Sequence, residues 1–174
     1  NAAAATLYGV EVEYVLQPDM IEGLQVDGSG SWIHSEYDDQ LLLDPTESAT
    51  LNIGGNQLIR APEWKLNFGA QYMAELGQRG DLLFRGEASY TSDVFHDVFN
   101  GTAPGQSGTV QDAYWVSNAR VVWRPADDRF EAQLFVENIT DEIYAHSLVA
   151  ASTTASVVGQ FSAPRTYGVR LSMK

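Results

Sequence analysis

The sequence contains no cysteine among its 174 residues. That absence excludes a disulfide framework, a thiolate metal site and a cysteine nucleophile together. Basic residues are also scarce, since 10 Lys and Arg stand against 23 Asp and Glu, for a formal net charge of -13. Nucleic-acid binding needs clustered basic side chains, so we expect no nucleic-acid partner. Polar or charged residues interrupt every apolar stretch before the roughly 18 residues of a membrane-spanning helix, which excludes a helical membrane protein.

What the sequence does contain is alternation of apolar and polar residues with a period of two, which is typical of β-strands. The alternation predicts an all-β fold, an antiparallel meander of about seven long strands, because no segment shows a helical period. The predicted strands are Val10–Leu16, Leu24–Trp32, Leu66–Tyr72, Leu82–Thr91, Trp115–Arg124, Phe130–Glu137 and Thr166–Met173.

The connections between the predicted strands alternate in length. Short turns are expected at 18–22, 75–80 and 125–128, and long polar segments at 38–58, 93–111 and 141–160. In an antiparallel meander every second connection lies at the same end, so one end carries turns and the other carries loops. This asymmetry is typical of an outer-membrane barrel, with short turns in the periplasm and long loops outside the cell.

Alternation alone leaves two environments open for the apolar face, namely lipid or a second protein layer. Aromatic residues lie towards the strand ends, as in the two aromatic girdles of a membrane protein. They are Tyr8, Tyr14, Trp32, Tyr37, Trp64, Tyr72, Tyr90, Trp115, Trp123, Phe130 and Tyr167. This pattern favours a barrel wall, and a soluble β-sandwich that binds carbohydrate or protein through its loops remains the alternative.

Two segments near the end of the chain carry a family resemblance. Residues 138–144 read NITDEIY and resemble an N-L-T-D-x-x-Y stretch of TonB-dependent outer-membrane receptors, and residues 164–171 read PRTYGVRL and resemble the P-R-x-Y-G-x-x-L terminal strand of the same family. The matching residues are Asn138, Asp141, Tyr144, Pro164, Arg165 and Tyr167. Looser matches in the same order extend the resemblance over essentially the whole chain.

The resemblance implies a barrel of about 22 strands around an N-terminal plug. Residues 1–174 would be the C-terminal segment of that barrel, with the plug domain and the N-terminal strands absent. It implies an outer-membrane receptor of a bacterium that binds and imports a scarce ligand, such as an iron-siderophore complex, with energy from TonB. The implied partners are the rest of the barrel, the plug, TonB acting through the plug, and outer-membrane lipid and lipopolysaccharide. A passive porin is a further alternative.

The candidate ligand-binding residues lie at the expected loop end of the strands. They are His34, Tyr37, Asp38, His96, Asp97 and His146, which can meet a metal chelate outside the cell. Their spacing matches no metal motif, so polar loop solvation is the competing interpretation and we assign no metal site. The acidic residues Glu36, Asp38, Asp39, Asp44 and Glu47 form either a solvated loop or a place where divalent cations bridge to lipopolysaccharide. No arrangement of residues supports catalysis, so we expect neither an enzyme nor a cofactor.

Overall fold

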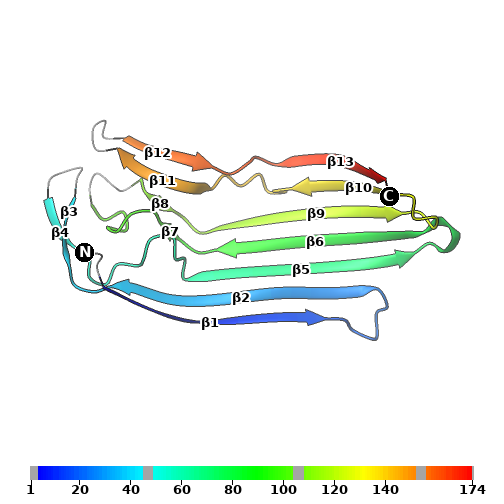
Figure 1. Cartoon of the computed structure of the whole chain (residues 1–174), viewed down its shortest axis with the longest axis horizontal. Helices are drawn as coiled ribbons and strands as arrows, with labels where there is room; N and C mark the ends of the chain where they lie inside the picture. The colour runs from blue at the N-terminus through cyan, green and yellow to red at the C-terminus, as the bar shows by residue number, and fades with distance from the viewer. Residues whose placement is uncertain (1–3, 45–48, 104–107, 152–155, 174) are drawn as a thin grey trace.

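The computed structural model of the protein describes residues 4–44, 49–103, 108–151 and 156–173. Seven antiparallel strands form one sheet in the order β1-β2-β5-β6-β9-β10-β13 (Figure 1). Their bounds are Ala5–Leu16 (β1), Leu24–Tyr37 (β2), Trp64–Glu75 (β5), Asp81–Thr91 (β6), Tyr114–Arg124 (β9), Phe130–Glu137 (β10) and Thr166–Met173 (β13). All seven predicted strands are confirmed, and so is the predicted meander, because each strand pairs with the next long strand of the chain.

The long connections hold short strands that the sequence did not predict. They form three two-stranded sheets, with the bounds Leu41–Asp44 (β3), Ala49–Asn52 (β4), Val94–Phe95 (β7), Val110–Gln111 (β8), Ala145–Ala151 (β11) and Ser156–Phe161 (β12). The two to four residues of β3, β4, β7 and β8 are too few for alternation to stand out, and β11 (AHSLVAA) and β12 (SVVGQF) do not alternate between apolar and polar residues.

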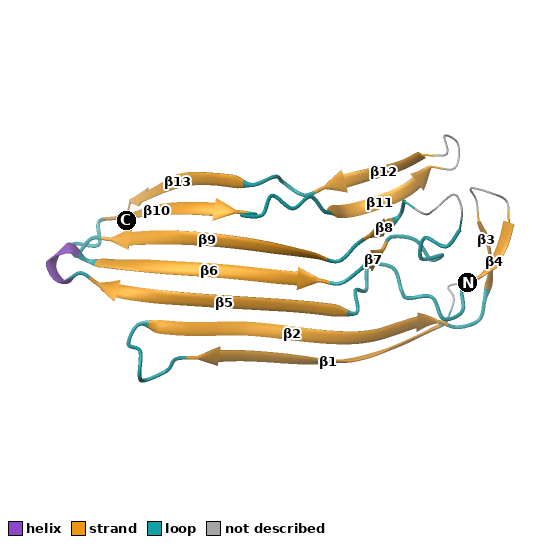
Figure 2. Ribbon diagram, turned by 180° about the vertical axis from the view of Figure 1, so that it is seen from behind, coloured by secondary structure: helices purple, strands orange, loops and turns teal. Residues whose placement is uncertain are grey.

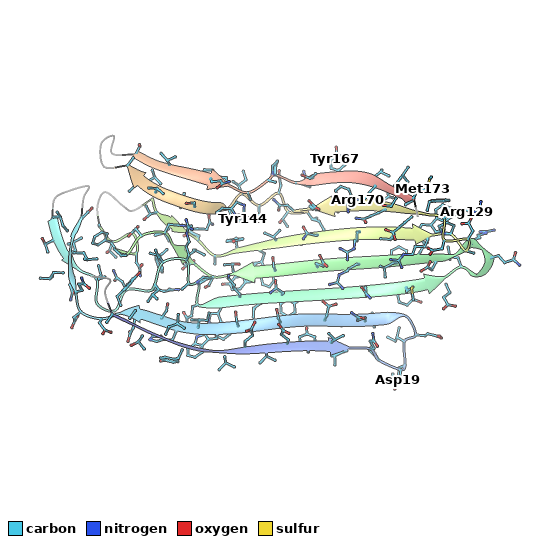
Figure 3. The ribbon with its side chains drawn as sticks, in the orientation of Figure 1. Asp19, Arg129, Tyr144, Tyr167, Arg170 and Met173 are labelled. Carbon is cyan, nitrogen blue, oxygen red and sulfur yellow. The ribbon has the colours of Figure 1, made fainter. Side chains whose placement is uncertain are left out.

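All three hairpins lie at one end of the sheet, which we call the loop end, and the tight turns lie at the other, the turn end (Figures 1 and 2). The turn between β5 and β6 contains the 3-10 helix η1, Gly77–Arg79. Asp19 and Arg129 mark the turn end in Figure 3. The alternation of short turns and long loops is thereby confirmed. No helix in the described residues is long and apolar enough to cross a membrane.

The strand register places the apolar residues of all seven strands on one face, which we call the outer face. Directly paired residues project to the same side of a sheet, so one ladder row shows its composition. The row through the middle of the sheet contains Val26, Ala70, Gly86, Ala119, Val136 and Tyr167. A neighbouring row on the opposite, inner face contains Gln25, Gln71, Arg85, Arg120, Phe135 and Gly168.

Exposure is inverted relative to a water-soluble protein. On the outer face Leu134 is 60% exposed and Val169 is 65% exposed, whereas the side chain of Arg85 on the inner face is only 15% exposed. A β-sandwich would cover the apolar face with a second sheet. Within the described ranges the other sheets are the three loop-end hairpins, and none of them is such a layer. The structure therefore gives no support to the sandwich alternative.

Aromatic side chains of the outer face gather in two bands. Towards the loop end the ring of Trp32 lies 5.9 Å from Tyr8 and 6.4 Å from Trp64. At the turn end Trp123 meets Phe130 edge to face at 5.5 Å. Rings with a polar edge favour the two boundaries of a membrane, so this arrangement fits the predicted girdles.

Tyr37 is an exception to the predicted girdles. It lies on the inner-face parity of β2, opposite Ala5, and packs against a small apolar cluster under the loops. The centre of this loop-end cluster is formed by Ile53, Phe99 and Ala103. The inclusion of Tyr37 was wrong because β2 continues without a bulge past Trp32, and parity then turns position 37 inward.

Candidate functional site

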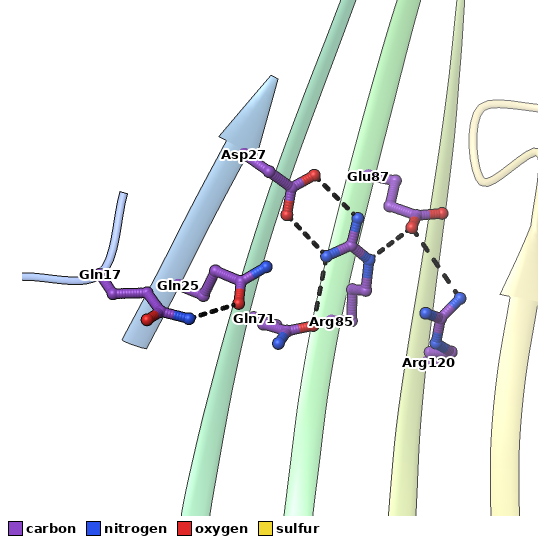
Figure 4. A network of polar contacts seen from close by, with 7 residues as sticks. All are labelled: Gln17, Gln25, Asp27, Gln71, Arg85, Glu87 and Arg120. Atoms are coloured by element: carbon purple, nitrogen blue, oxygen red, sulfur yellow. Dashed lines mark hydrogen bonds and ion pairs between the residues drawn. The ribbon is translucent and has the colours of Figure 1, made fainter. Parts of the chain in front are cut away.

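The inner face of the sheet carries a ladder of charges that neutralise one another. The guanidinium of Arg85 donates two hydrogen bonds to Asp27, at 2.8 and 3.0 Å, and a third to Glu87 at 2.5 Å (Figure 4). Arg120 lies 3.9 Å from the same Glu87 carboxylate. Paired charges of this kind suit a hydrated lumen, because they keep polar groups satisfied without attracting a ligand strongly.

A pocket of about 200 Å³ lies where the inner face of the sheet meets the loops. Two strands of the sheet supply Lys65 and Tyr114, the segment before β5 supplies Arg60, and the loop-end hairpins supply His96 and His146. We call this space the loop-end pocket. Among the described residues, its lining carries cations, imidazoles and a phenol but no carboxylate.

Two of the residues that line the loop-end pocket, Tyr114 and His146, both contact the ring of Tyr144. The ring of Tyr144 lies 4.3 Å from that of Tyr114, with 11° between their planes. The imidazole of His146 meets Tyr144 edge to face at 5.1 Å. Arg60 spans the opening by donating from Nη2 to the hydroxyl of Ser147 at 3.0 Å. These contacts join three chain segments and fix the pocket's shape.

His96 is held in an unusual state. Both ring nitrogens are shielded from solvent and have no hydrogen-bond partner in the described part of the chain. Burial, assisted by the nearby charge of Arg60, lowers the pKa of His96 below its ordinary value. The imidazole is therefore neutral at pH 7, with one nitrogen able to accept and the other able to donate.

Asp97, the next residue, serves its own loop. Its carboxylate accepts from the backbone N–H of Phe99 at 2.6 Å and from the hydroxyl of Thr109. Burial is the main cause that raises the pKa of Asp97 above its ordinary value, and the charge of Asp44 adds to it. Asp97 thus organises the turn rather than facing the pocket.

The six candidate ligand residues do not form one group. His96 and His146 share the loop-end pocket. His34 lies on the outer face, 4.9 Å from the ring of Tyr8 and 3.5 Å from a carboxylate oxygen of Glu36. Tyr37 packs in the loop-end cluster. Asp38 is exposed, and its backbone N–H donates to the carbonyl of Ala4.

The predicted acidic run is broken in the structure. Asp44 is fully buried, so it is not a solvated loop residue, whereas Asp38 and Asp39 are exposed. Glu47 lies outside the described residues. In the parts of the chain that are described, no three His, Cys, Asp or Glu side chains come together as a metal site.

The residues of the family motif meet one another rather than a ligand. The buried amide of Asn138 donates to the carbonyls of Glu142 and Ala163, at 2.8 and 3.2 Å, and accepts from the N–H of Glu142 at 2.9 Å. Asp141 accepts from the N–H of Arg165 at 2.7 Å. These bonds tie the end of β10 to the start of β13, and we call them the clasp.

The remaining motif residues lie around the clasp. Tyr144 stacks on Tyr114, which lines the loop-end pocket, Pro164 precedes β13, and Tyr167 is 80% exposed on the outer face (Figure 3). Arg165 also donates to the carbonyl of Ile139 at 3.2 Å. The motif therefore joins two strands, and only Tyr144 approaches the candidate site.

Sequence reasoning missed Arg60, Lys65 and Tyr114 as site residues. Lys65 and Tyr114 sit on the inner parity of their strands, where polar residues are ordinary, and Arg60 lies in a loop. In the sequence, Arg60 and Lys65 stand out only because they are two of the 10 basic residues of the chain and lie close together at the loop end.

A family model described as "TonB dependent receptor-like, beta-barrel" matches residues 1–139. The chain belongs to the TonB-dependent receptor β-barrel family. The match stops before most of the motif residues, so Asn138 is the one of the six that falls within it. A search of curated proteins gave no match.

Solved receptors share the fold of this TonB-dependent receptor barrel over nearly its whole length. The ferric yersiniabactin uptake receptor FyuA from Yersinia pestis matches 98% of the chain at 20% identity with a TM-score of 0.77. The siderophore receptor PiuA from Acinetobacter baumannii matches 98% at 16% identity with a TM-score of 0.72. BauA, the ferric preacinetobactin receptor from the same species, matches 96% at 15% identity with a TM-score of 0.69.

The chain spans about a quarter of each solved receptor, namely 24%, 22% and 22% of those chains in the same order. The seven-stranded sheet is accordingly similar to part of a TonB-dependent receptor barrel. Family and neighbours are transport receptors of the outer membrane rather than enzymes.

Proposed function

We propose that this chain forms the last seven strands and the associated extracellular loops of an outer-membrane importer of ferric chelates, driven by TonB. The remaining strands and the plug belong to the same protein. In this arrangement the turn end faces the periplasm and the loop end faces outward. The similar solved structures are receptors for ferric chelates and siderophores, and this supports the ligand class.

The observation that carries the proposal is the exposed apolar outer face, continuous over seven strands. Lipid is the solvent that such a face requires, and the aromatic bands lie where headgroups would meet it. β1 and β13 are the edge strands of the sheet. In hydrocarbon, each unpaired backbone group of an open edge costs several kcal/mol, so further strands must close the wall.

Within the proposed importer, the described candidates divide by position. We propose that His96 and His146, which line the loop-end pocket, lie next to the bound ligand. His34 lies among the outer aromatic residues and is placed to contact lipid headgroups. Exposed Asp38 and Asp39 are placed to meet lipopolysaccharide through divalent cations.

These 174 residues contribute no cysteine of their own to a site-directed labelling test of the wall. Single cysteines are introduced at 132, 133, 134 and 135 in the complete protein that contains this chain, reconstituted in lipid vesicles and spin-labelled. We expect oxygen accessibility to be high at 132 and 134, and accessibility to a water-soluble nickel complex to be high at 133 and 135. Water-soluble reagent reaching all four positions equally would contradict a lipid-facing wall.

Transport is tested separately, by uptake of radioactive iron chelates into cells that express the complete protein as their sole receptor. We expect uptake that stops when TonB is deleted or a protonophore is added. Uptake that persists under both treatments would indicate a passive porin instead.

A further inference from the structure

A groove lies at the turn end of the sheet, between the end of β9 and the turn that contains η1, which is purple in Figure 2. We call it the turn-end groove. Its volume is about 480 Å³, and its lining residues are Leu76, Gln78, Arg79, Leu82, Trp123 and Pro125. Leu82 pairs directly with Trp123, and Trp123 with Ala132, in a row of the outer face. The groove therefore opens on the exposed, apolar side of the sheet.

The shape of the turn-end groove is fixed by contacts between the turn and β9. The indole Nε1 of Trp123 donates to the carbonyl of Arg79 at 2.9 Å. The N–H of Leu76 donates to the carbonyl of Gly80 at 2.8 Å and closes the turn. Gly80 has a φ of 89°, and a Cβ there would collide with the carbonyl oxygen of Arg124. Glycine thus lets the turn lie close against β9, so the groove is formed before a ligand binds.

Arg79 is the one charged residue among those that line the groove. In the described parts of the chain, no carboxylate lies within ion-pair distance of its guanidinium. Arg124, at the same end, instead lies 3.7 Å from Asp81 and 2.9 Å from Glu131 on the inner face. Glu75 pairs with Asp81 and so lies on the inner face as well. The charge of Arg79 is therefore available to an anion that approaches from the outer side.

The position of Arg79 determines which anion can reach it. In the proposed importer the outer face meets lipid, and the contact of Trp123 with Phe130 marks the aromatic band at the turn end. An arginine beside this band has acyl chains on one side and headgroups on the other, as basic residues that bind lipid headgroups do. Lipid phosphate is the anion present at that depth, and guanidinium binds phosphate oxygens through paired hydrogen bonds.

The size and lining of the groove suit part of one lipid molecule. Pockets of about 300–1,000 Å³ hold drug-sized organic molecules, so about 480 Å³ can hold a glycerol backbone and a segment of acyl chain. Gln78 adds an amide that can donate to ester or phosphate oxygens beside Arg79. The apolar walls for the chain are supplied by Leu76, Leu82, Trp123 and Pro125.

We propose that the turn-end groove is a binding site for one glycerophospholipid, with its phosphodiester bound by Arg79 and an acyl chain lying against Leu82 and Trp123. The assignment rests on the lipid-facing wall of the proposed function, and it adds a specific lipid at one position of that wall. Because the groove joins the β5–β6 turn to β9, the bound lipid ties both to the membrane boundary.

The test is native mass spectrometry of the complete protein that contains this chain, released from non-ionic detergent micelles. The probes are dioleoylphosphatidylglycerol, dioleoylglycerol, which has the chains without the phosphate, glycerol phosphate, which has the phosphate without the chains, and inorganic phosphate. We expect the most tightly bound phosphatidylglycerol to bind about fivefold more tightly than dioleoylglycerol. Neither small phosphate should displace it at equal concentration.

Two results with these probes would overturn the proposal. Equal binding of the two lipids would mean that the groove takes acyl chains and has no headgroup site. Displacement of phosphatidylglycerol by inorganic phosphate at equal concentration would mean a site for free anions only.

Variants of the complete protein locate the site. Arg79→Gln should remove the preference for phosphatidylglycerol, and Arg79→Lys should retain most of it, because lysine also binds phosphate as a point charge. Arg129→Gln is the matched control. Arg129 lies at the same end (Figure 3), its side chain is 83% exposed and 3.7 Å from Asp127, and its replacement should change nothing. An unchanged preference in Arg79→Gln, or an equal loss in Arg129→Gln, would place the binding elsewhere and overturn the assignment.

The same spectra show whether a second copy of the protein occupies the groove. Gln78→Trp narrows the groove and should weaken phosphatidylglycerol binding in a protein that stays monomeric. Lipid-free dimers that this substitution abolishes would assign the groove to self-association and overturn the lipid site.

The outcomes separate this proposal from the import function. Energised iron uptake by a protein that binds the two lipids equally would retain the importer and refute the lipid site. Lipid binding that depends on Arg79, in a protein that imports no iron chelate, would retain the lipid site and refute the transport role. Heat-modifiable migration of each variant on gels reports whether its barrel has folded.

Discussion

The wall and the loop end of this protein are stabilised in different ways. In the wall, long strands repeat one pattern, and parity alone decides whether a side chain lies on the outer or the inner face. At the loop end, short hairpins are held by the Ile53–Phe99–Ala103 cluster and by side chains that bond the backbone, as Asp97 does at Phe99. The stability of the wall depends on the solvent that meets each face, whereas the stability of the loop end depends on individual side-chain contacts.

The clasp stands at the boundary between these regions. β10 ends at Glu137, and the chain then turns through Asn138 and Asp141, both with positive φ, at 54° and 57°. Asn and Asp are the residues that tolerate this conformation best, since their short polar side chains can bond the local backbone. The loop can thus leave and rejoin the wall without unsatisfied polar groups.

The most direct test of the contrast between the wall and the loop end is to place a charged side chain on the outer face. Leu134, midway along β10 and 60% exposed, is replaced by arginine. If lipid covers this face, the variant should lose about 2–4 kcal/mol of folding free energy, since the cost of a charge is largest near the bilayer midplane. Reversible denaturation of the complete barrel in lipid vesicles measures the loss.

Gln133→Arg is the control for the adjacent inner position. Although Gln133 pairs with Arg170, a like-charge pair across strands costs only a fraction of a kcal/mol, up to about 1 kcal/mol. Equal destabilisation by the two substitutions would mean that lipid and lumen do not distinguish the faces, and the wall would have to be interpreted differently.

The same contrast explains what the sequence could predict. Alternation located seven strands and their apolar outer face because parity is a long-range, repeated pattern, and β2 kept it from Leu24 to Tyr37. The loop-end pocket had no such pattern. Arg60, Lys65 and Tyr114 come together only through the register of β5, β6 and β9 and the folding of two loops over them.

The motif illustrates a further limit. The family resemblance came from two segments, NITDEIY and PRTYGVRL. Sequence similarity, however, does not show which contacts their residues make. The contacts are between the two segments, with Asp141 bound to the N–H of Arg165 and Asn138 to the carbonyl of Ala163. The sequence also could not tell which candidate histidines lie on which face of the sheet, because only the register shows that His34 lies on the outer face.

A more local effect is expected from opening the clasp. Asn138→Ala leaves the carbonyls of Glu142 and Ala163 without their donor in a site where Asn138 is only 6% exposed. Unsatisfied buried polar groups cost about 1–3 kcal/mol, and alanine at positive φ adds about 1–2 kcal/mol. Hydrogen exchange should rise at 138–144 and 162–166 and stay unchanged in β5 and β6.

Asn138→Gly separates the two causes of that loss. Glycine accepts positive φ without strain but cannot bond the carbonyls, so it should recover only the conformational part of the loss. Full recovery with glycine would mean that the hydrogen bonds of the clasp contribute nothing, and exchange that spreads through β5 and β6 would mean that the clasp and the wall are one cooperative unit.

The smallest expected effect concerns pH at the loop end. The pKa of His96 is lowered by burial and by Arg60, so the folded state takes up a proton less readily than the unfolded chain, where histidine titrates near 6.5. The stability that depends on neutral His96 is then complete above about pH 6.5 and is lost as the pH falls through the folded pKa. Lys65, His146 and Tyr114 also line its pocket and offer no carboxylate to stabilise the protonated ring.

Hydrogen exchange at 94–103, corrected for the intrinsic rate, should therefore quicken between about pH 7.5 and pH 5.5, while β5 and β6 do not change.

Acidification affects loop stability through Asp97 in the opposite direction, and this makes the control variant His96→Gln informative. Its raised pKa means that the charged carboxylate costs loop stability above the folded pKa, and acidification relieves that cost. His96→Gln removes the imidazole but leaves Asp97 in place, so the variant should lose the acid-induced quickening, and a slowing due to Asp97 follows only as the pH falls through the folded pKa of that carboxyl. If the variant quickened as much as the parent protein, the acid response would belong to another group, and the loop end would not owe its pH dependence to the neutral imidazole of the pocket.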